Sequence, residues 1–298
     1  SVRKLLQGSA NLEFWETYKL PEIYQQLVAA DNVLATILSK EASADSVATA
    51  ADNVEKIADA ADANVSEADS LLAELGQDKK DTEANQSMEE FAKQHPLFAL
   101  LQISQYNGQL SPGSTVGIAH AKDMDKISEY LNMKQVKEVL PRNLALKWGV
   151  KAIDDKEQFY ELYALKVTNR DGSPALGGDV VTDANADFMQ QAGRSEQMVN
   201  MVMNDAEGSK AWARLTKENI GRQIAIVLDE MVYSAPNVND EITGGRSQIT
   251  GHFTPEEAKD LANVLKSGKM AASVHIVQED VVGPSLGQEA INAGVISY

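Results

Sequence analysis

Hydrophobic positions along the chain alternate between the two-residue period of strands and the longer period of helices. Residues 10–18 alternate as a half-buried strand does, and Pro21 follows at a position where a helix can begin. Helical spacing then continues through four apolar residues: Ile23, Leu27, Leu34 and Ile37. The chain is therefore predicted to begin with a strand followed by an amphipathic helix.

A different pattern covers residues 47–75, where apolar residues recur at alternating intervals of four and three. This heptad spacing predicts a long Ala-rich helix that ends at Gly76. We expect it to pack antiparallel on another helix, and a parallel coiled-coil dimer is the alternative. Further helical pieces are predicted around Met88 and after Pro96.

From about residue 115 the strand and helix patterns are mixed, which predicts an α+β fold. Helices are expected over residues 123–131, after Asn204 or Asp205, and after the capping box Thr254-Pro255-Glu256-Glu257, with Gly268 ending the last of them. A strong turn signal lies at residues 169–174, where we expect a subdomain boundary. Strands are expected at residues 115–119, 144–150, 163–167, 199–203, 223–228, 232–235 and 274–282.

Composition is that of a soluble globular chain, with 298 residues, 43% apolar and 24% charged. No apolar run reaches the roughly 18 residues that span a bilayer. Residues 291–298 are uncharged and mostly apolar, and the chain begins at Ser1 without an initiator Met or a signal peptide. We therefore expect both ends to have been cut from a longer protein.

Charge narrows the class of partner. The formal net charge of −17 argues against nucleic acid, which needs clustered Lys and Arg. Residues 39–90 carry fourteen acidic and four basic side chains, a net charge of −10 in one segment. Cysteine is absent and the four histidines are scattered, so thiol catalysis is excluded and neither a metal site nor a cofactor is predicted.

One motif suggests an enzyme. Residues 283–287 fit the G-x-S-x-G pattern of serine hydrolases, with Ser285 as the nucleophile. Neither Asp nor His follows Ser285, as the triad order of α/β-hydrolases requires, so a hydrolase is the disfavoured alternative. Residues 243–247 (TGGRS) resemble a phosphate loop, but a strand pattern follows them, which favours a β-turn.

Methionine is concentrated in the second half of the chain, at Met189, Met198, Met201, Met203 and Met231. A Met-rich surface adapts to varied apolar sequences, and ordinary core packing is the alternative interpretation. With no catalytic constellation left, the residues indicate a binding or structural module.

Residues 224–236, 242–262 and 282–287 form several long motifs in one order, and these motifs resemble those of the SecD family of protein-export subunits. Residues 224–229 (IAIVLD) and 232–236 (VYSAP) resemble the family's LAIVLD…V.SAP. Residues 242–262 are similar to I.GGRAQITGNFT.EEAKDLA, and residues 282–287 match VGPSLG. Weaker similarity covers residues 1–18 and 159–185.

The resemblance implies the first periplasmic domain of a subunit at the bacterial inner membrane. It implies an α+β fold with a ferredoxin-like base, residues 1–168 and 274–290, and an inserted α+β head, residues 169–273. The Ala-rich helical insertion at about 39–110 departs from the family, and residues 291–298 would begin a truncated transmembrane helix. The head would bind unfolded preprotein during export driven by the proton-motive force, beside the SecYEG translocon and SecF. The domain itself would not be an enzyme.

Given this resemblance, we also expect roles for particular residues. Preprotein would contact Met201, Met203, Val232, Tyr233 and Val238. A head–base hinge is expected at Gly172, Pro174, Gly268 and Ala271, less restrained than in relatives because two family prolines are missing here. Gly283, Pro284, Ser285 and Gly287 would form the turn into the membrane. In the predicted hairpin, Asp229-Glu230-Met231 replaces Asp-Gly-Lys, which leaves its turn type open.

Overall fold

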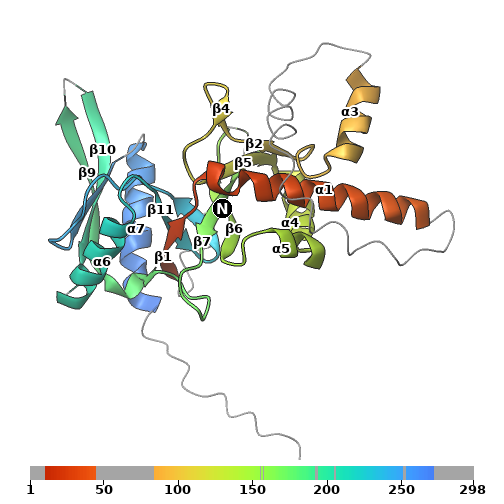
Figure 1. Cartoon of the computed structure of the whole chain (residues 1–298). Coiled ribbons are helices and arrows are strands. Elements are labelled where there is room, and N and C mark those ends of the chain that lie inside the picture. Colours follow the sequence, from red (N-terminus) through yellow and green to blue (C-terminus); the bar gives the residue numbers. More distant parts are fainter. Residues whose placement is uncertain are drawn as a thin grey trace, which may run out of the picture.

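The structure is a computed structural model that describes residues 11–44, 84–154, 156, 158–191, 194–204, 206–250 and 253–271. The predicted heptad helix, the strand at 274–282, the turn at 283–287 and the membrane helix at 291–298 lie outside these residues. The described part is an α+β fold in which strands dominate (Figure 1). Its ferredoxin-like base remains a prediction.

The first half of the chain follows the predicted order of elements. One expectation was wrong: after Pro96 the chain makes a turn into a short strand instead of a helix. The Ala99 N–H donates to the His95 carbonyl at 2.9 Å and the Leu101 N–H to the Leu97 carbonyl at 2.8 Å, so the chain makes one hydrogen-bonded turn before β2 begins. The buried Asp31 carboxylate accepts the Leu97 N–H at 2.8 Å and ties this turn to α1. The elements are β1 (Leu12–Thr17), α1 (Leu20–Ala44), α3 (Ala84–Gln94), β2 (Leu101–Ile103), β3 (Gln105–Tyr106), β4 (Gln109–Leu110), β5 (Thr115–His120), α4 (Met124–Asn132), α5 (Lys134–Val139), β6 (Leu144–Ala152) and β7 (Phe159–Lys166).

The second half comprises β8 (Leu176–Gly177), β9 (Val181–Gln191), β10 (Arg194–Met203), α6 (Ala206–Glu218), β11 (Ile224–Leu228), β12 (Met231–Ser234), β13 (Arg246–Thr250) and α7 (Pro255–Ala271). The capping box is confirmed, since Thr254 N–H donates to Glu257 Oε2 at 3.0 Å and Glu257 N–H to Thr254 Oγ1 at 3.3 Å. The predicted end at Gly268 was wrong, because α7 continues to Ala271. A glycine ends a helix by adopting the left-handed conformation, and Gly268 stays helical.

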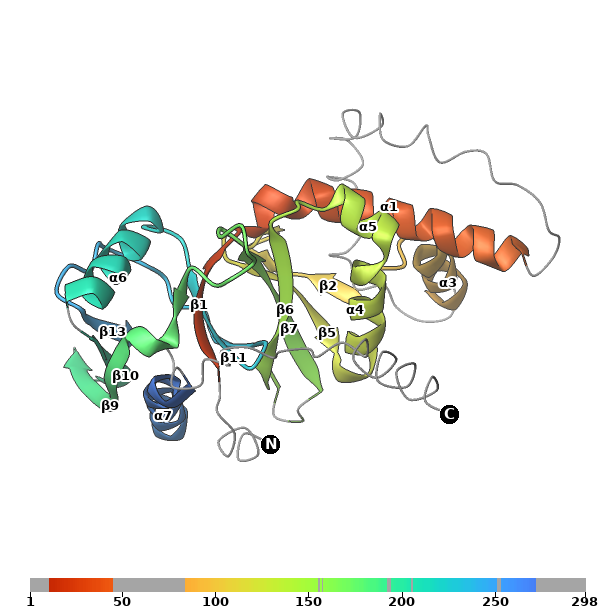
Figure 2. The same ribbon diagram turned by 90° about the horizontal axis from the view of Figure 1, so that it is seen from below.

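Five strands close into a ring. The eight-stranded sheet has the order β2-β5-β7-β6-β12-β11-β1-β8, and β1 also pairs with β7 at Glu16↔Lys166 and Thr17↔Leu165. The path β7-β6-β12-β11-β1 therefore returns to its start, as Figure 2 shows for β1, β11, β6 and β7. A small core fills the ring, formed by Trp15, Leu165, Ala225, Val227 and Val232.

Two larger cores flank this ring. The base core joins α1, α4 and α5 to β2, β5 and β7, and includes Leu27, Leu101 and Leu162. The head core joins the three-stranded sheet β13-β10-β9 to α6, α7 and the outer side chains of β1 and β11. Although β11 and β12 fall in the sequence range expected for the head, they complete the same sheet as the base strands. The eight-stranded sheet therefore contains strands from both the expected base and the expected head.

The β11–β12 hairpin turns on two residues with positive φ, Asp229 at 47° and Glu230 at 70°. Left-handed values at both central positions define a type I′ turn, which settles the turn type. Glycine is favoured at such positions because a Cβ is strained there. Glu230 compensates in part through an ion pair with Lys147.

Replacing Glu230 by Gly is expected to stabilise the domain relative to Glu230→Ala by about 1 kcal/mol. Both variants lose the carboxylate, so the comparison isolates the backbone strain from the ion pair, which is solvent-exposed at Glu230. Urea denaturation measures the free energy of unfolding of each. Equal stabilities for the two variants would contradict the turn assignment.

Candidate functional site: an apolar cavity in the head

A cavity of about 180 Å³ lies between β10, β11, β13 and α6. We call it the head cavity. Its apolar walls are Met201, Trp212, Ile224, Ile226, Pro236, Val238, Ile242 and Ile249. An apolar cavity of about 150 Å³ is large enough to hold benzene, so this volume is enough for one large apolar side chain.

Hydrogen bonds fix the polar groups of the cavity wall. Trp212 Nε1 donates to Ser247 Oγ at 2.7 Å, and the ring packs edge-on against Phe14 with centroids 5.2 Å apart. The Thr216 hydroxyl donates to the Trp212 carbonyl at 2.9 Å and accepts the Ile242 N–H at 3.0 Å. These donors and acceptors are occupied, and the wall therefore offers apolar contact more than polar recognition.

One rim of the cavity is a loop with exposed polar side chains, Asn237, Asn239 and Asp240. The loop is held at Val238, whose N–H donates to the Arg222 carbonyl at 2.8 Å and whose carbonyl accepts the Gly221 N–H at 2.8 Å. Its position is thereby set by backbone bonds, independent of its side chains.

The other rim is β13, which pairs with β10 on one side only. Within the described residues no strand covers its outer edge. Ser247 and Ile249 of β13 are buried towards the cavity, whereas Gln248 lies at its exposed side. The cavity thus lies beside an open strand edge. The turn before β13 has Gly245 at φ 64° and is followed by that strand, as expected for residues 243–247.

The structure separates the five residues predicted to bind preprotein. Met201 and Val238 line the head cavity, while Met203 is buried nearby, 5% exposed. Val232 and Tyr233 line another pocket of about 520 Å³ between β6, β12 and α7, where burial raises the pKa of Tyr233 to about 12. Four of the five side chains are buried, so they provide walls and core packing, and no exposed apolar patch is formed.

Sequence reasoning missed most of the cavity wall. Trp212 lies in the helix expected after Asn204 or Asp205, and Ile249 lies in the strand pattern after residue 247, but neither was predicted to bind a ligand. The rim residues Asn239 and Asp240 were not singled out. The one available signal was the short polar stretch between the β12 and β13 patterns, which is where the rim loop lies.

The four expected hinge residues occupy two different settings. Gly172 has φ 78° in an exposed turn, and Asn169 Nδ2 donates to the Pro174 carbonyl at 2.7 Å across it. Gly268 and Ala271 belong to α7. Their hinge role stays a prediction.

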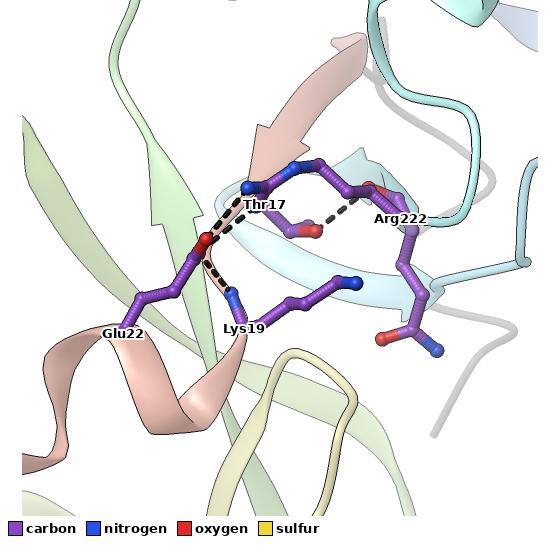
Figure 3. A network of polar contacts seen from close by, with 5 residues as sticks. Thr17, Lys19, Glu22 and Arg222 are labelled. Atoms are coloured by element: carbon purple, nitrogen blue, oxygen red, sulfur yellow. Dashed lines mark hydrogen bonds and ion pairs between the residues drawn. The ribbon is translucent and has the colours of Figure 1, made fainter.

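A polar junction joins the cavity loop to α1 (Figure 3). Arg222 donates two hydrogen bonds to Glu22, at 2.9 and 2.6 Å, and the Lys19 N–H also donates to this carboxylate. The Arg222 hydrogen bonds, opposed in part by burial, lower the pKa of Glu22 to about 2. Thr17 Oγ1 and Ser114 bind the next residue, Gln223, at its carbonyl and its side chain.

The Glu22→Gln variant is expected to be less stable than the parent chain by about 1 kcal/mol at pH 7, a value limited by partial solvent exposure of the pair. Because the folded-state pKa lies below the ordinary 4.5, the ionised carboxylate stabilises the fold above about pH 4.5, and this contribution is lost as the pH falls towards 2. Urea denaturation across this range measures it. Glu138→Gln, an exposed change on α5 with the same charge difference, is the control. A stability difference independent of pH would contradict the assignment.

The described residues form an α+β domain with an apolar cavity between β10, β11, β13 and α6. The profile of the SecDF P1 head subdomain matches residues 155–272. The SecD subunit of protein translocase from Rhodothermus marinus is 36% identical over 99% of this chain and 42% of its own length. That from Syntrophobacter fumaroxidans is 42% identical over 41% of this chain and 22% of its own length.

Two solved structures were also found to be similar to this chain. SecDF from Thermus thermophilus is 23% identical, with 74% of this chain and 32% of that chain covered and a TM-score of 0.30. A structure of SecDF described as a membrane component that enhances protein export covers 86% of this chain and 93% of its own, with 21% identity and a TM-score of 0.28. Superposition is poor at such scores, so the assignment rests on the sequence relatives. The chain belongs to the SecD family. It spans less than half the length of the SecD subunits from Rhodothermus marinus and Syntrophobacter fumaroxidans.

Proposed function

We propose that this chain is the periplasmic domain of a Sec translocon accessory subunit and that its head cavity binds emerging preprotein. The observation that carries the proposal is the apolar cavity beside the open edge of β13. An extended polypeptide can add to a strand edge through main-chain hydrogen bonds, which are independent of sequence. One apolar side chain of that polypeptide would enter the cavity.

This mode of binding suits a ligand of variable sequence. Main-chain pairing supplies affinity without a motif, and a single apolar pocket makes the contact selective for unfolded chain, because a folded protein buries its large apolar side chains. Met201 in the wall adapts to different side chains through its flexible thioether.

The wider context is part of the same proposal. Preprotein would be handed over beside SecYEG and SecF, on the periplasmic side of the inner membrane, with the proton-motive force as the energy source. The domain would contribute binding and no catalysis. None of the described helices is long and apolar enough to cross a membrane.

Crosslinking tests this site directly. A photo-reactive residue in place of Gln248 or Asn239, both exposed at the cavity rim, is expected to form adducts with a preprotein arrested during export. The same residue in place of Arg170, in the exposed turn at residues 169–174, is the control. Adducts from none of the rim positions would refute the proposal.

Filling the cavity gives a quantitative test. Val238→Phe places a larger side chain at the cavity wall, where the backbone is held by two hydrogen bonds. Loss of one buried apolar anchor is expected to weaken binding of an unfolded apolar peptide by about tenfold. Fluorescence anisotropy measures the affinity, and thermal unfolding of the variant confirms that the fold is retained. Unchanged affinity in a folded variant would place the peptide elsewhere.

A further inference from the structure

A groove on the base is not explained by binding in the head. It has a volume of about 560 Å³ and lies between α4, α5 and β6, three elements that are labelled in Figure 1. We call it the base groove. It is lined by Ser128, Leu131, Asn132, Lys137, Leu140, Pro141, Arg142, Leu144, Ala145, Leu146, Trp148 and Leu162.

The walls of the base groove are apolar and incompletely covered. Leu144, Leu146 and Trp148 share one face of β6 and are each only half-buried. The floor beneath them is buried, with Leu131 7% and Leu162 1% exposed. Trp148 Nε1 donates to Ser128 Oγ at 2.9 Å, which fixes the indole and leaves its ring along the groove. Large side chains that remain partly exposed in a row provide apolar contact area for a ligand.

The groove follows a strand edge. Residues from both faces of β6 line it, since Ala145 projects opposite to Leu144 and Leu146. On one side β6 pairs with β7 from Leu144 to Trp148, but with β12 it pairs only at Gly149. Over its first half, the second edge of β6 therefore has no strand partner among the described residues.

The rim of the groove is cationic. Lys137 and Arg142 are both exposed, and no Asp or Glu is among the lining residues. Neither cation forms an ion pair with any of the residues that the structure describes. Acidic side chains outnumber basic ones in this chain, 44 to 27, and yet these two basic side chains have no acidic partner among the described residues. Two unpaired cations beside an apolar edge favour a ligand that is itself acidic.

We propose that the base groove binds an extended, acidic segment of another polypeptide, with apolar residues at alternate positions. The alternation matches the side chains on one face of β6, which recur every second residue along a strand. Acidic residues between them would face Lys137 and Arg142. The head cavity differs, because its lining includes Asp240 and no cation. The two sites thus select ligands of different charge.

Binding is measured with the full chain and a labelled peptide of alternating Leu and Glu, by fluorescence anisotropy. We expect saturable binding that weakens as NaCl is raised, since the rim charges are exposed to solvent. A peptide of alternating Ser and Glu, with the same charge but no apolar residues, is expected to bind at least tenfold more weakly. Equal binding of the two peptides would overturn the proposal, as would no binding of the Leu–Glu peptide.

Variants locate the site. The double change Lys137→Glu with Arg142→Glu is expected to weaken the Leu–Glu peptide at least tenfold, and thermal unfolding checks that it is folded. Arg170→Glu with Lys156→Glu makes the same change in net charge at exposed positions away from the groove and is expected to leave the affinity unchanged. Equal loss in both double variants would indicate general charge repulsion and overturn the assignment.

Other occupants give distinct results. Val238→Phe alters the head cavity alone and is expected to leave binding of the Leu–Glu peptide intact. The proposal for the base groove and the proposal for the head cavity can therefore be refuted independently. Concentration-dependent self-association abolished by the Lys137/Arg142 double change would identify a second copy as the occupant. Peptide binding only after removal of residues 45–83 would identify the acidic segment of the same chain. Either result would overturn binding of another polypeptide.

Discussion

Strand β1 is the element on which the rest of the structure depends. It pairs with β11 from Leu12 to Glu16, and also with β7 and β8, so it closes the ring of strands. Phe14 faces the head core and Trp15 the core inside the ring. With both faces buried, the Glu13 carboxylate on the Trp15 face must be satisfied locally, and it accepts hydrogen bonds from Trp15 Nε1 at 2.8 Å and from Asn11 Nδ2 at 2.6 Å. One strand therefore serves two subdomains.

The polar junction extends this coupling to the head cavity. Val238, in the cavity wall, is hydrogen-bonded to the backbone of Arg222, whose guanidinium binds Glu22 on α1. Only a few bonds separate the cavity wall from the base helix. A displacement of the rim loop would break these bonds, reorient the Arg222 side chain or move α1 with it. The geometry thus gives the head a direct mechanical link to the base.

Features that depend only on neighbouring residues could be predicted from the sequence. The pairing of strands far apart in the sequence could not. The capping box at Thr254 and Glu257 needs only neighbouring residues and was recognised. The pairing of Glu16 with Lys166 closes the ring between positions 150 residues apart, and no local pattern encodes it. Periodicity identified Met201 as a strand residue, but whether its side chain is core, cavity wall or surface depends on β11 and α6 folding over it. The helix expected after Pro96 is also limited to one hydrogen-bonded turn, because the chain pairs with β5 from Leu101 onward.

Charge and shape together explain why one domain would contain two different binding sites, the head cavity and the base groove. A chain with a net charge of −17 repels acidic segments at long range, so a site for them needs local cations, as at Lys137 and Arg142. The head cavity needs no such feature, because an apolar side chain is recognised by burial alone. Both sites lie beside incompletely paired strands, β6 and β13. Edge strands left open in a soluble domain promote aggregation, and exposed charged or polar residues next to both edges limit self-pairing while leaving each edge accessible to a ligand.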